Sequence, residues 1–376
     1  MTATRSLTAI ALFALIPVQS NAADCSGASK TLADILKEGI GTKMAEAKVR
    51  DLIRDCPDLA EAHFQLGISL IDQGKPADAV TSLKKAIELK RDPLFYIALG
   101  NASVANDNLT AAEQAFDEAL KIDPNSTRAM QGMSVVYVKQ KRLPAAEEVL
   151  RRAIQITPEE AGLFYNLGLV LDQLGRLDEA SESFRAASER RAAYAEALIH
   201  LGDVSLRSGN SENAEKAFRQ ASLHDPKNPL VWLGLASALE ANKDLPGALS
   251  NCEKALALDP NNLRGRLNRA ILLVKLGKKE DGVKQLASLL EANPKNAEVE
   301  SALGWAFLQN QDLNAAQTHL EEALKLNDKD SFSYNNLGVL FELKGESDKA
   351  KRAFEQARSL SPQLGAPDSN LKTLDE

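Results

Sequence analysis

Apolar residues recur at spacings of three and four along most of the chain, in stretches separated by short polar turns. In the segment "LFYNLGLVLDQLG", Leu163, Leu167, Leu171 and Leu174 follow this spacing, which places their side chains on one face of an α-helix. The next stretch follows a short turn that contains Gly175, and glycine recurs in the corresponding turns further along the chain. The pattern therefore predicts an all-α protein made of helix–turn–helix hairpins.

These hairpins repeat with a period of 34 residues. The period is regular over residues 93–364, residues 60–92 fit it with one deletion near Arg91, and residues 26–59 form a degenerate first repeat. One hairpin alone leaves its apolar face exposed, so consecutive hairpins must stack. We expect a degenerate capping repeat over residues 24–59, nine further repeats over 60–364, and a polar C-terminal tail over 365–376.

Small residues occupy two fixed places in each repeat. The twentieth residue is alanine in nine repeats and Gly282 in the other. Small residues at these places let the two helices of a hairpin approach closely. Proline near the end of most repeats, as at Pro124 and Pro260, lacks an N–H group and ends the second helix. The eighth residues are Ala33, Gly67, Gly100, Ser134, Gly168, Gly202, Ala236, Ala270, Gly304 and Gly338.

This pattern resembles the tetratricopeptide repeat (TPR) family over residues 26–364. The resemblance implies a right-handed superhelical solenoid of about ten repeats, with a concave groove that binds a protein or peptide partner. It also implies that the second, fifth, ninth, twelfth and thirteenth residues of each first helix line that groove. Among them, the candidate partner-binding residues are Tyr165, Leu233, Leu267, Ile271, Trp305, Arg264 and Lys275.

Two features of these candidates leave alternatives open. The apolar stripe suits an extended peptide or an amphipathic helix, but part of it could instead be packing between repeats. Trp305 is favoured as an interface anchor, because it stands at a groove position and not at the position of Trp232, which we expect in the core.

The repeat 263–296 is unusually basic. It has eight Lys and Arg residues against three acids, and Arg266 and Arg269 stand where other repeats are mostly apolar. One interpretation is a degenerate repeat whose arginines reach out to pair with neighbours such as Glu298 and Glu300. The other is a site for an anion or a carboxylate beside the groove.

The N-terminal residues predict export. Arg5 precedes an apolar run from Leu7 to Val18, which is too short to span a bilayer, and small residues follow up to Ala23. We therefore expect residues 1–23 to be a signal peptide and the mature protein to be periplasmic, or secreted where no outer membrane exists. Asp24 before Cys25 does not suit a lipoprotein signal, and no later run is long enough for membrane insertion.

The remaining composition argues against several functions. A formal net charge of −7 disfavours binding to nucleic acid or to an anionic membrane. The sequence has no phosphate-binding glycine loop and no metalloprotease or serine-hydrolase motif, and its four histidines stand in separate repeats. We expect no enzyme activity, no catalytic residue, no cofactor and no metal site.

The cysteines predict one disulfide. Cys25 directly precedes the first repeat and Cys56 ends its second helix, so an antiparallel hairpin brings them together. An oxidising compartment would preserve the bond. Cys252 stands at a position that holds phenylalanine in several other repeats, and we expect it to be buried and reduced.

Two functions remain as hypotheses. The first is an exported adaptor or scaffold that binds a segment of a protein partner in its groove and supports assembly of an envelope or secretion complex. The alternative is a recognition subunit of a polysaccharide or cell-wall synthesis and export system, which binds glycan-handling enzymes or glycan itself.

Overall fold

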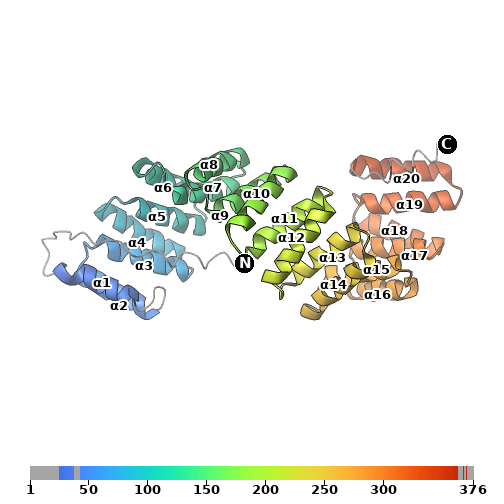
Figure 1. Cartoon of the computed structure of the whole chain (residues 1–376), viewed down its shortest axis with the longest axis horizontal. Coiled ribbons are helices and arrows are strands. Elements are labelled where there is room, and N and C mark those ends of the chain that lie inside the picture. Colours follow the sequence, from blue (N-terminus) through green and yellow to red (C-terminus); the bar gives the residue numbers. More distant parts are fainter. Residues whose placement is uncertain (1–24, 38–42, 363–366, 368–369, 371–376) are drawn as a thin grey trace. The chain divides into compact units, whose positions relative to one another are not determined.

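The computed structural model describes residues 25–37, 43–362, 367 and 370 of the 376-residue chain. Twenty α-helices and one short 3₁₀ helix, η1 (Cys25–Gly27), occupy this described part, and it contains no β-strand (Figure 1). The helices divide between two compact units, residues 1–191 and 192–376. We call these the N-terminal and C-terminal units. The predicted signal peptide, residues 1–23, lies outside the described residues.

Both units consist of helix pairs. The helices of the N-terminal unit are α1 (Ala28–Lys37), α2 (Lys43–Asp55), α3 (Ala60–Asp72), α4 (Pro76–Leu89), α5 (Pro93–Ala105), α6 (Leu109–Ile122), α7 (Thr127–Lys139), α8 (Leu143–Ile156), α9 (Ala161–Gln173) and α10 (Leu177–Arg190). Those of the C-terminal unit are α11 (Ala195–Arg207), α12 (Ser211–His224), α13 (Pro229–Ala241), α14 (Leu245–Leu258), α15 (Leu263–Lys275), α16 (Lys279–Ala292), α17 (Ala297–Gln309), α18 (Leu313–Leu326), α19 (Ser331–Leu343) and α20 (Ser347–Leu360).

Within each unit, the first helix of a repeat packs on its own second helix, and that second helix packs on the first helix of the next repeat. First helices of successive repeats also touch, as α15 touches α17 and α17 touches α19. This arrangement confirms the predicted all-α stack of helix hairpins. No helix in the described part of the chain combines the length and apolar composition needed to cross a bilayer.

The small eighth residue of a repeat lies against a large side chain of the second helix. A Cβ atom added to Gly100 would lie 2.6 Å from the ring of Phe116, and one added to Gly202 would lie 2.5 Å from Phe218. The optimal separation of two non-bonded carbon atoms is about 3.5 Å or more. Only glycine therefore leaves room for the ring. The prediction that small residues let the two helices approach closely is confirmed. They do so by leaving space for the large side chain of the second helix.

The turns inside the hairpins from α3 to α20 share one backbone conformation. Gly175 has φ = 75° and Gly277 has φ = 83°, which is the left-handed region that glycine adopts without steric cost. Other repeats place Asp107, Lys141 or Lys243 at the same position, also with positive φ. The turn geometry is therefore imposed by the hairpin, whether or not glycine is present.

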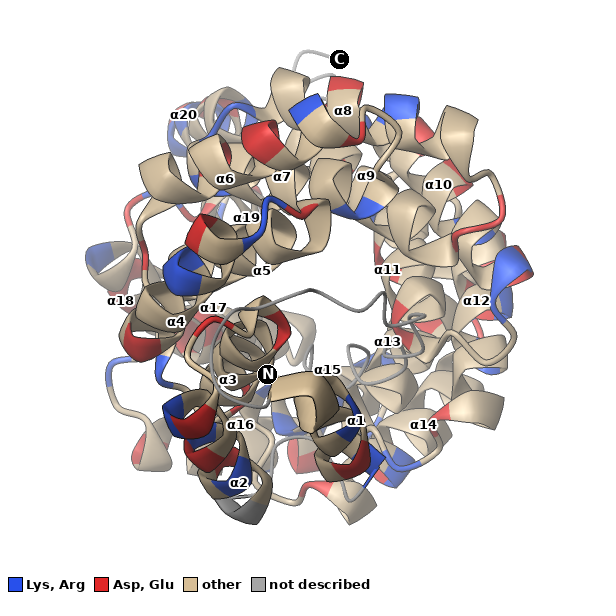
Figure 2. Ribbon diagram, turned by 90° about the vertical axis from the view of Figure 1, so that its left-hand side faces the viewer, with Lys and Arg blue, Asp and Glu red and all other residues tan. Residues whose placement is uncertain are grey.

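Polar side chains join successive repeats at recurring positions. Gln140 of α7 donates to Glu113 of α6 at 3.0 Å, and Asn242 of α13 donates to Glu215 of α12 at 2.7 Å. The hydrogen bond from Gln140 lowers the pKa of Glu113 below its usual value. Acidic and basic residues are interspersed over the helices (Figure 2), so charges of both signs occur along the stack.

The predicted disulfide is confirmed. Cys25 and Cys56 are bonded, with Cα atoms 5.9 Å apart, and they tie the start of α1 to the end of α2. Cys252 is a free, fully buried thiol whose Sγ donates to the carbonyl oxygen of Gly265 at 3.1 Å. Burial raises the pKa of the Cys252 thiol to about 11, so it stays protonated and unreactive at neutral pH.

Reduction of the disulfide should loosen the first repeat. The bond closes a loop with a sequence separation of 31. A loop of that length reduces the conformational entropy of the unfolded chain, which stabilises the folded repeat by about 3–4 kcal/mol. Because no earlier repeat packs on α1 in the described structure, we expect amide exchange in α1 and α2 to accelerate on reduction, while exchange in α5 to α8 changes little. Hydrogen exchange followed by mass spectrometry measures this.

The control is the double variant Cys25→Ser, Cys56→Ser. It should exchange rapidly in α1 and α2 with or without reductant. Equal protection of these helices in the oxidised and reduced wild-type protein would show that the disulfide does not stabilise the repeat.

Candidate functional site

A pocket in the C-terminal unit lies on a face shared by first helices. Its volume is about 690 Å³, which is in the range of ligand-binding pockets in proteins. α13, α15, α17 and the start of α19 contribute its walls. The residues that line it are Glu240, Leu267, Asn268, Ile271, Lys275, Ala297, Glu298, Ser301, Ala302, Trp305, Asn327, Asp330 and Phe332.

Helical periodicity explains why these side chains share one face. Leu267, Ile271 and Lys275 are four residues apart on α15, and Ser301 and Trp305 have the same spacing on α17. Because α17 touches both α15 and α19, the rows of side chains on these helices form one continuous surface. We call this surface the Trp305 pocket.

Trp305 forms the aromatic wall of the pocket. It packs against a core cluster that includes Leu267 and Ala302, yet it remains partly exposed. Lys275 Nζ lies 6.0 Å from the centre of its ring and 2.6 Å from the Glu240 carboxylate. The lysine is therefore held between a carboxylate and an aromatic face, and its charge is already partnered before any ligand arrives.

The far wall of the pocket comes from α19. Ser301 on α17 and Ser333 on α19 are hydrogen bonded at 2.7 Å in a buried position, which joins the two helices. Asp330 caps α19 by accepting from the backbone N–H of Phe332. This cap holds Phe332 at the pocket with 48% of its surface exposed. Phe332 is the second residue of its repeat and so stands at a family groove position, but it is not among the predicted site residues.

The charge of the pocket is acidic. Glu240, Glu298 and Asp330 contribute three carboxylates, against the single cation of Lys275. Glu298 has no ion-pair partner among the residues that the structure describes. The groove surface therefore has the opposite sign from the one that the charge of residues 263–296 predicts.

The predicted site residues divide into two groups. Leu267, Ile271, Trp305 and Lys275 come together in the Trp305 pocket. The other three do not line it. Leu233 is a core residue with 3% of its surface exposed, and Arg264 is exposed on α15 outside the pocket wall. Tyr165 belongs to the N-terminal unit, where its ring packs 5.8 Å from that of Phe184.

One arginine of α15 forms an ion pair with a neighbouring repeat, as the degenerate-repeat interpretation expects, but its partner is neither Glu298 nor Glu300. The Glu300 carboxylate accepts a hydrogen bond from His319 Nδ1 at 2.7 Å within its own repeat. Arg269 instead lies 3.6 Å from Glu253 of the preceding repeat. No group of three or more potential metal-binding side chains occurs in the described part of the chain.

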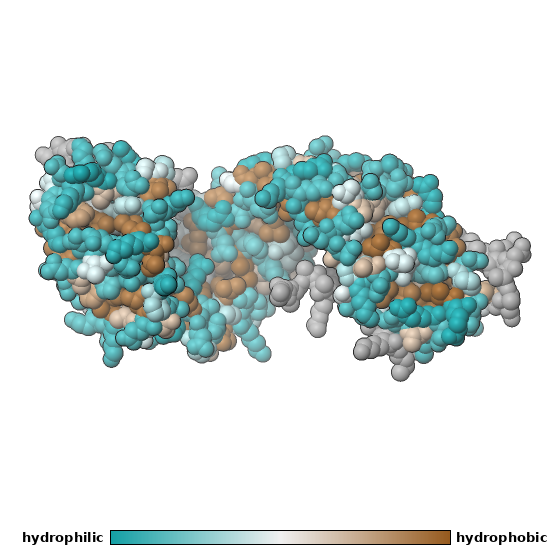
Figure 3. All heavy atoms as spheres, turned by 180° about the vertical axis from the view of Figure 1, so that it is seen from behind, coloured by the Kyte–Doolittle hydropathy of each residue, from teal (hydrophilic) through white to brown (hydrophobic). Residues whose placement is uncertain are grey.

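Apolar surface occurs elsewhere as separate strips between hydrophilic side chains, on the face that Figure 3 shows. The combination of partly exposed aromatic rings with polar groups in a concave surface is suited to holding a side chain or a short segment of another molecule.

Family comparisons agree with this architecture. One tetratricopeptide repeat family model matches residues 64–127, 165–221, 201–262 and 301–364, and a second matches residues 103–167 and 239–306. A crystal structure of a tetratricopeptide repeat protein from Parabacteroides merdae is similar in fold, with a TM-score of 0.63 and 19% identity. The match covers 67% of this chain and 99% of that one.

Characterised relatives match over shorter regions. The general transcriptional corepressor ssn6 of Schizosaccharomyces pombe is 29% identical over 137 residues, which are 36% of this chain and 12% of that protein. The PEX5-related protein of Homo sapiens is 28% identical over 153 residues, which are 38% of this chain and 24% of that protein. The chain thus spans a quarter or less of the length of these relatives.

Proposed function

Because the chain belongs to the tetratricopeptide repeat family, whose repeats form scaffolds for protein–protein interactions, we propose that it is an exported adaptor that binds a segment of a protein partner in the Trp305 pocket. The observation that carries this proposal is the partly exposed Trp305 in a concave wall shared by α15, α17 and α19. Large aromatic side chains of this kind are typical anchors of protein interfaces.

The chemistry of the pocket defines the partner segment. Leu267, Ile271, Trp305 and Phe332 offer apolar surface, so the segment presents at least one large apolar side chain. The surplus of carboxylates, with Glu298 unpaired among the described residues, favours a basic residue beside it. A short amphipathic helix or an extended stretch with this composition fits a groove built from helices.

The compartment rests on two observations. The signal-peptide pattern of residues 1–23 indicates export, and the Cys25–Cys56 bond supports it, because disulfides persist mainly in oxidising compartments. The adaptor acts in the periplasm, or outside a cell without an outer membrane, and supports assembly of an envelope or secretion complex. It has no catalytic role in this proposal.

A glycan-recognition role is the alternative. Trp305 and Phe332 present aromatic faces in the same pocket as carboxylates and the amides of Asn268 and Asn327, and such a mixture also suits a sugar. The protein would then serve polysaccharide or cell-wall synthesis and export. Retention of purified envelope polysaccharide by the wild-type protein, with loss of retention in Trp305→Ala, would favour this alternative.

Truncation of the anchor should weaken partner binding strongly. Trp305→Ala removes the aromatic wall, and loss of an interface anchor costs about 2 kcal/mol or more, which is roughly a 30-fold increase in Kd. Titration calorimetry with the partner captured from an envelope extract measures the change. Leu223→Ala, at a residue that is 78% exposed on α12 and does not line the pocket, is the matched control. A loss below about 0.5 kcal/mol for Trp305→Ala would rule out the anchor role.

The sign of the pocket charge gives a second test. Glu298→Lys should weaken binding by about 0.5–1 kcal/mol if the partner segment is basic, and the difference should shrink at high salt because of screening. Arg264→Glu, at an exposed residue outside the pocket wall, should have a smaller effect. Tighter binding of Glu298→Lys would instead indicate an acidic partner segment.

Export can be tested on the full-length chain. Expression in a Gram-negative host should yield a periplasmic protein whose N-terminus lies just after the Asn21–Ala23 segment, as measured by fractionation and intact mass. Leu12→Arg interrupts the apolar run of the signal and should leave the unprocessed chain inside the cell. A wild-type chain that keeps Met1 and stays in the cytoplasm would contradict the proposed localisation.

A further inference from the structure

One repeat carries arginine where all others carry an apolar residue. Arg269 is the seventh residue of its repeat, and the other nine repeats hold leucine or methionine there, as with Leu235 and Leu303 in the neighbouring repeats. Both of those leucines are 2% exposed. Arg266, one helical turn earlier on the same side of α15, is a second cation, and both arginine side chains are partly exposed.

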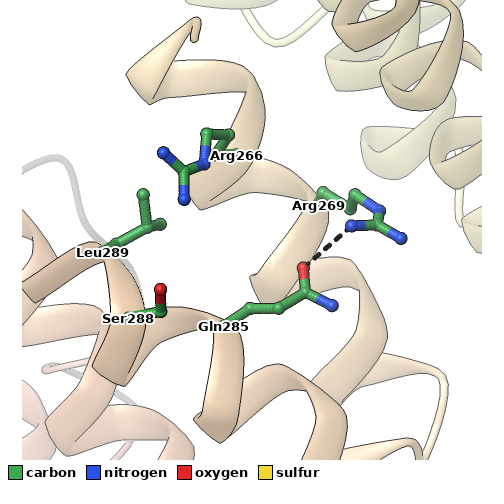
Figure 4. Close-up of a pocket in the computed structure, with 5 residues that line it drawn as sticks. All are labelled: Arg266, Arg269, Gln285, Ser288 and Leu289. Carbon is green, nitrogen blue, oxygen red and sulfur yellow. Dashed lines mark hydrogen bonds between the residues drawn. The ribbon is translucent and has the colours of Figure 1, made fainter. Parts of the chain in front are cut away.

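The two arginines line a small cavity between the helices of this repeat. Arg266 and Arg269 come from α15, and Gln285, Ser288 and Leu289 face them from α16 (Figure 4). The cavity has a volume of about 110 Å³. It is too small for a peptide but holds a few water molecules or one small anion.

The guanidinium groups are not fully satisfied by the protein. Arg269 donates from one terminal nitrogen to Gln285 Oε1 at 3.2 Å. Its Nε is buried without a hydrogen bond, and the Glu253 carboxylate at 3.6 Å is too far to accept one. The guanidinium group of Arg266 has neither a hydrogen-bond nor an ion-pair partner among the described residues. The two arginines thus border one cavity with their guanidinium groups pointing away from each other (Figure 4), and the Glu253 carboxylate beside Arg269 is half exposed.

We propose that this cavity binds a small tetrahedral oxyanion, a phosphate or sulfate that is either free or carried as a terminal group on a larger molecule. Guanidinium groups are forked donors that match phosphate oxygens with paired hydrogen bonds. The Ser288 hydroxyl on the opposite wall supplies a further donor.

The oxyanion site is separate from the Trp305 pocket. Successive residues on an α-helix are turned by about 100°, so Arg266 and Arg269 lie on the side of α15 opposite to Ile271 and Lys275. The two cavities have no lining residue in common. The protein could therefore bind an anion and a partner segment at the same time, and the proposal does not depend on the proposed function.

Thermal unfolding with inorganic phosphate as the probe tests the site. At constant ionic strength set with chloride, phosphate at about ten times its Kd should raise the Tm of the full chain by roughly 2–4 °C. The double variant Arg266→Gln, Arg269→Leu should lose this shift. It should still fold, because leucine or methionine fills the same position in every other repeat. Arg264→Gln, at an exposed arginine of the same helix that does not line the cavity, should keep the shift.

Phenyl phosphate separates the two sources of the anion. A shift with phenyl phosphate as large as with inorganic phosphate indicates that the site takes a terminal phosphoryl group, and a shift with inorganic phosphate alone indicates a free anion. Both results support the site. Equal shifts in the wild-type protein and the double variant, or no shift of the wild-type Tm with either probe relative to chloride, would overturn it.

Discussion

The contact between a small residue on the first helix of each repeat and a larger side chain on the second determines how closely the two helices of a hairpin pack. Phenylalanine occurs on the second helix only opposite glycine, as in the pairs Gly100–Phe116 and Gly168–Phe184. Where the first helix has alanine instead, the second has a smaller side chain, such as Cys252 or Leu286. The largest side chain thus occurs only where the first helix leaves room for its ring, as close packing in protein interiors requires.

This contact leaves each hairpin with one further face to bury, and stacking buries it. Side chains such as Gln140 and Asn242 then join one repeat to the next through carboxylates of the preceding second helix. First helices of adjacent repeats consequently lie side by side within a unit. The Trp305 pocket is an outcome of that arrangement, because its walls come from four successive repeats and no single repeat contains it.

The repeat 263–296 shows how such a scaffold acquires local chemistry. Its core contact is kept by Ala270 and Leu286, so the hairpin forms as in its neighbours. Arg266 and Arg269 then replace apolar residues beside that contact and open a polar cavity. A stack of similar repeats tolerates this change because the neighbouring repeats retain their own cores around Leu235 and Leu303.

The sequence alone determined the backbone plan of each repeat. The helices, their turns, the small residues and the Cys25–Cys56 bond follow from spacings inside 34 residues, where helical geometry relates position to direction. Partners in other repeats were decided only by the tertiary structure. The burial of Leu233, the pairing of Lys275 with Glu240 and the approach of Arg269 to Glu253 each depend on how adjacent repeats pack. These side chains meet between repeats, and the 34-residue pattern of one repeat does not specify such contacts. The acidic charge of the pocket therefore results from residues of several stacked repeats and not from the net charge of one repeat.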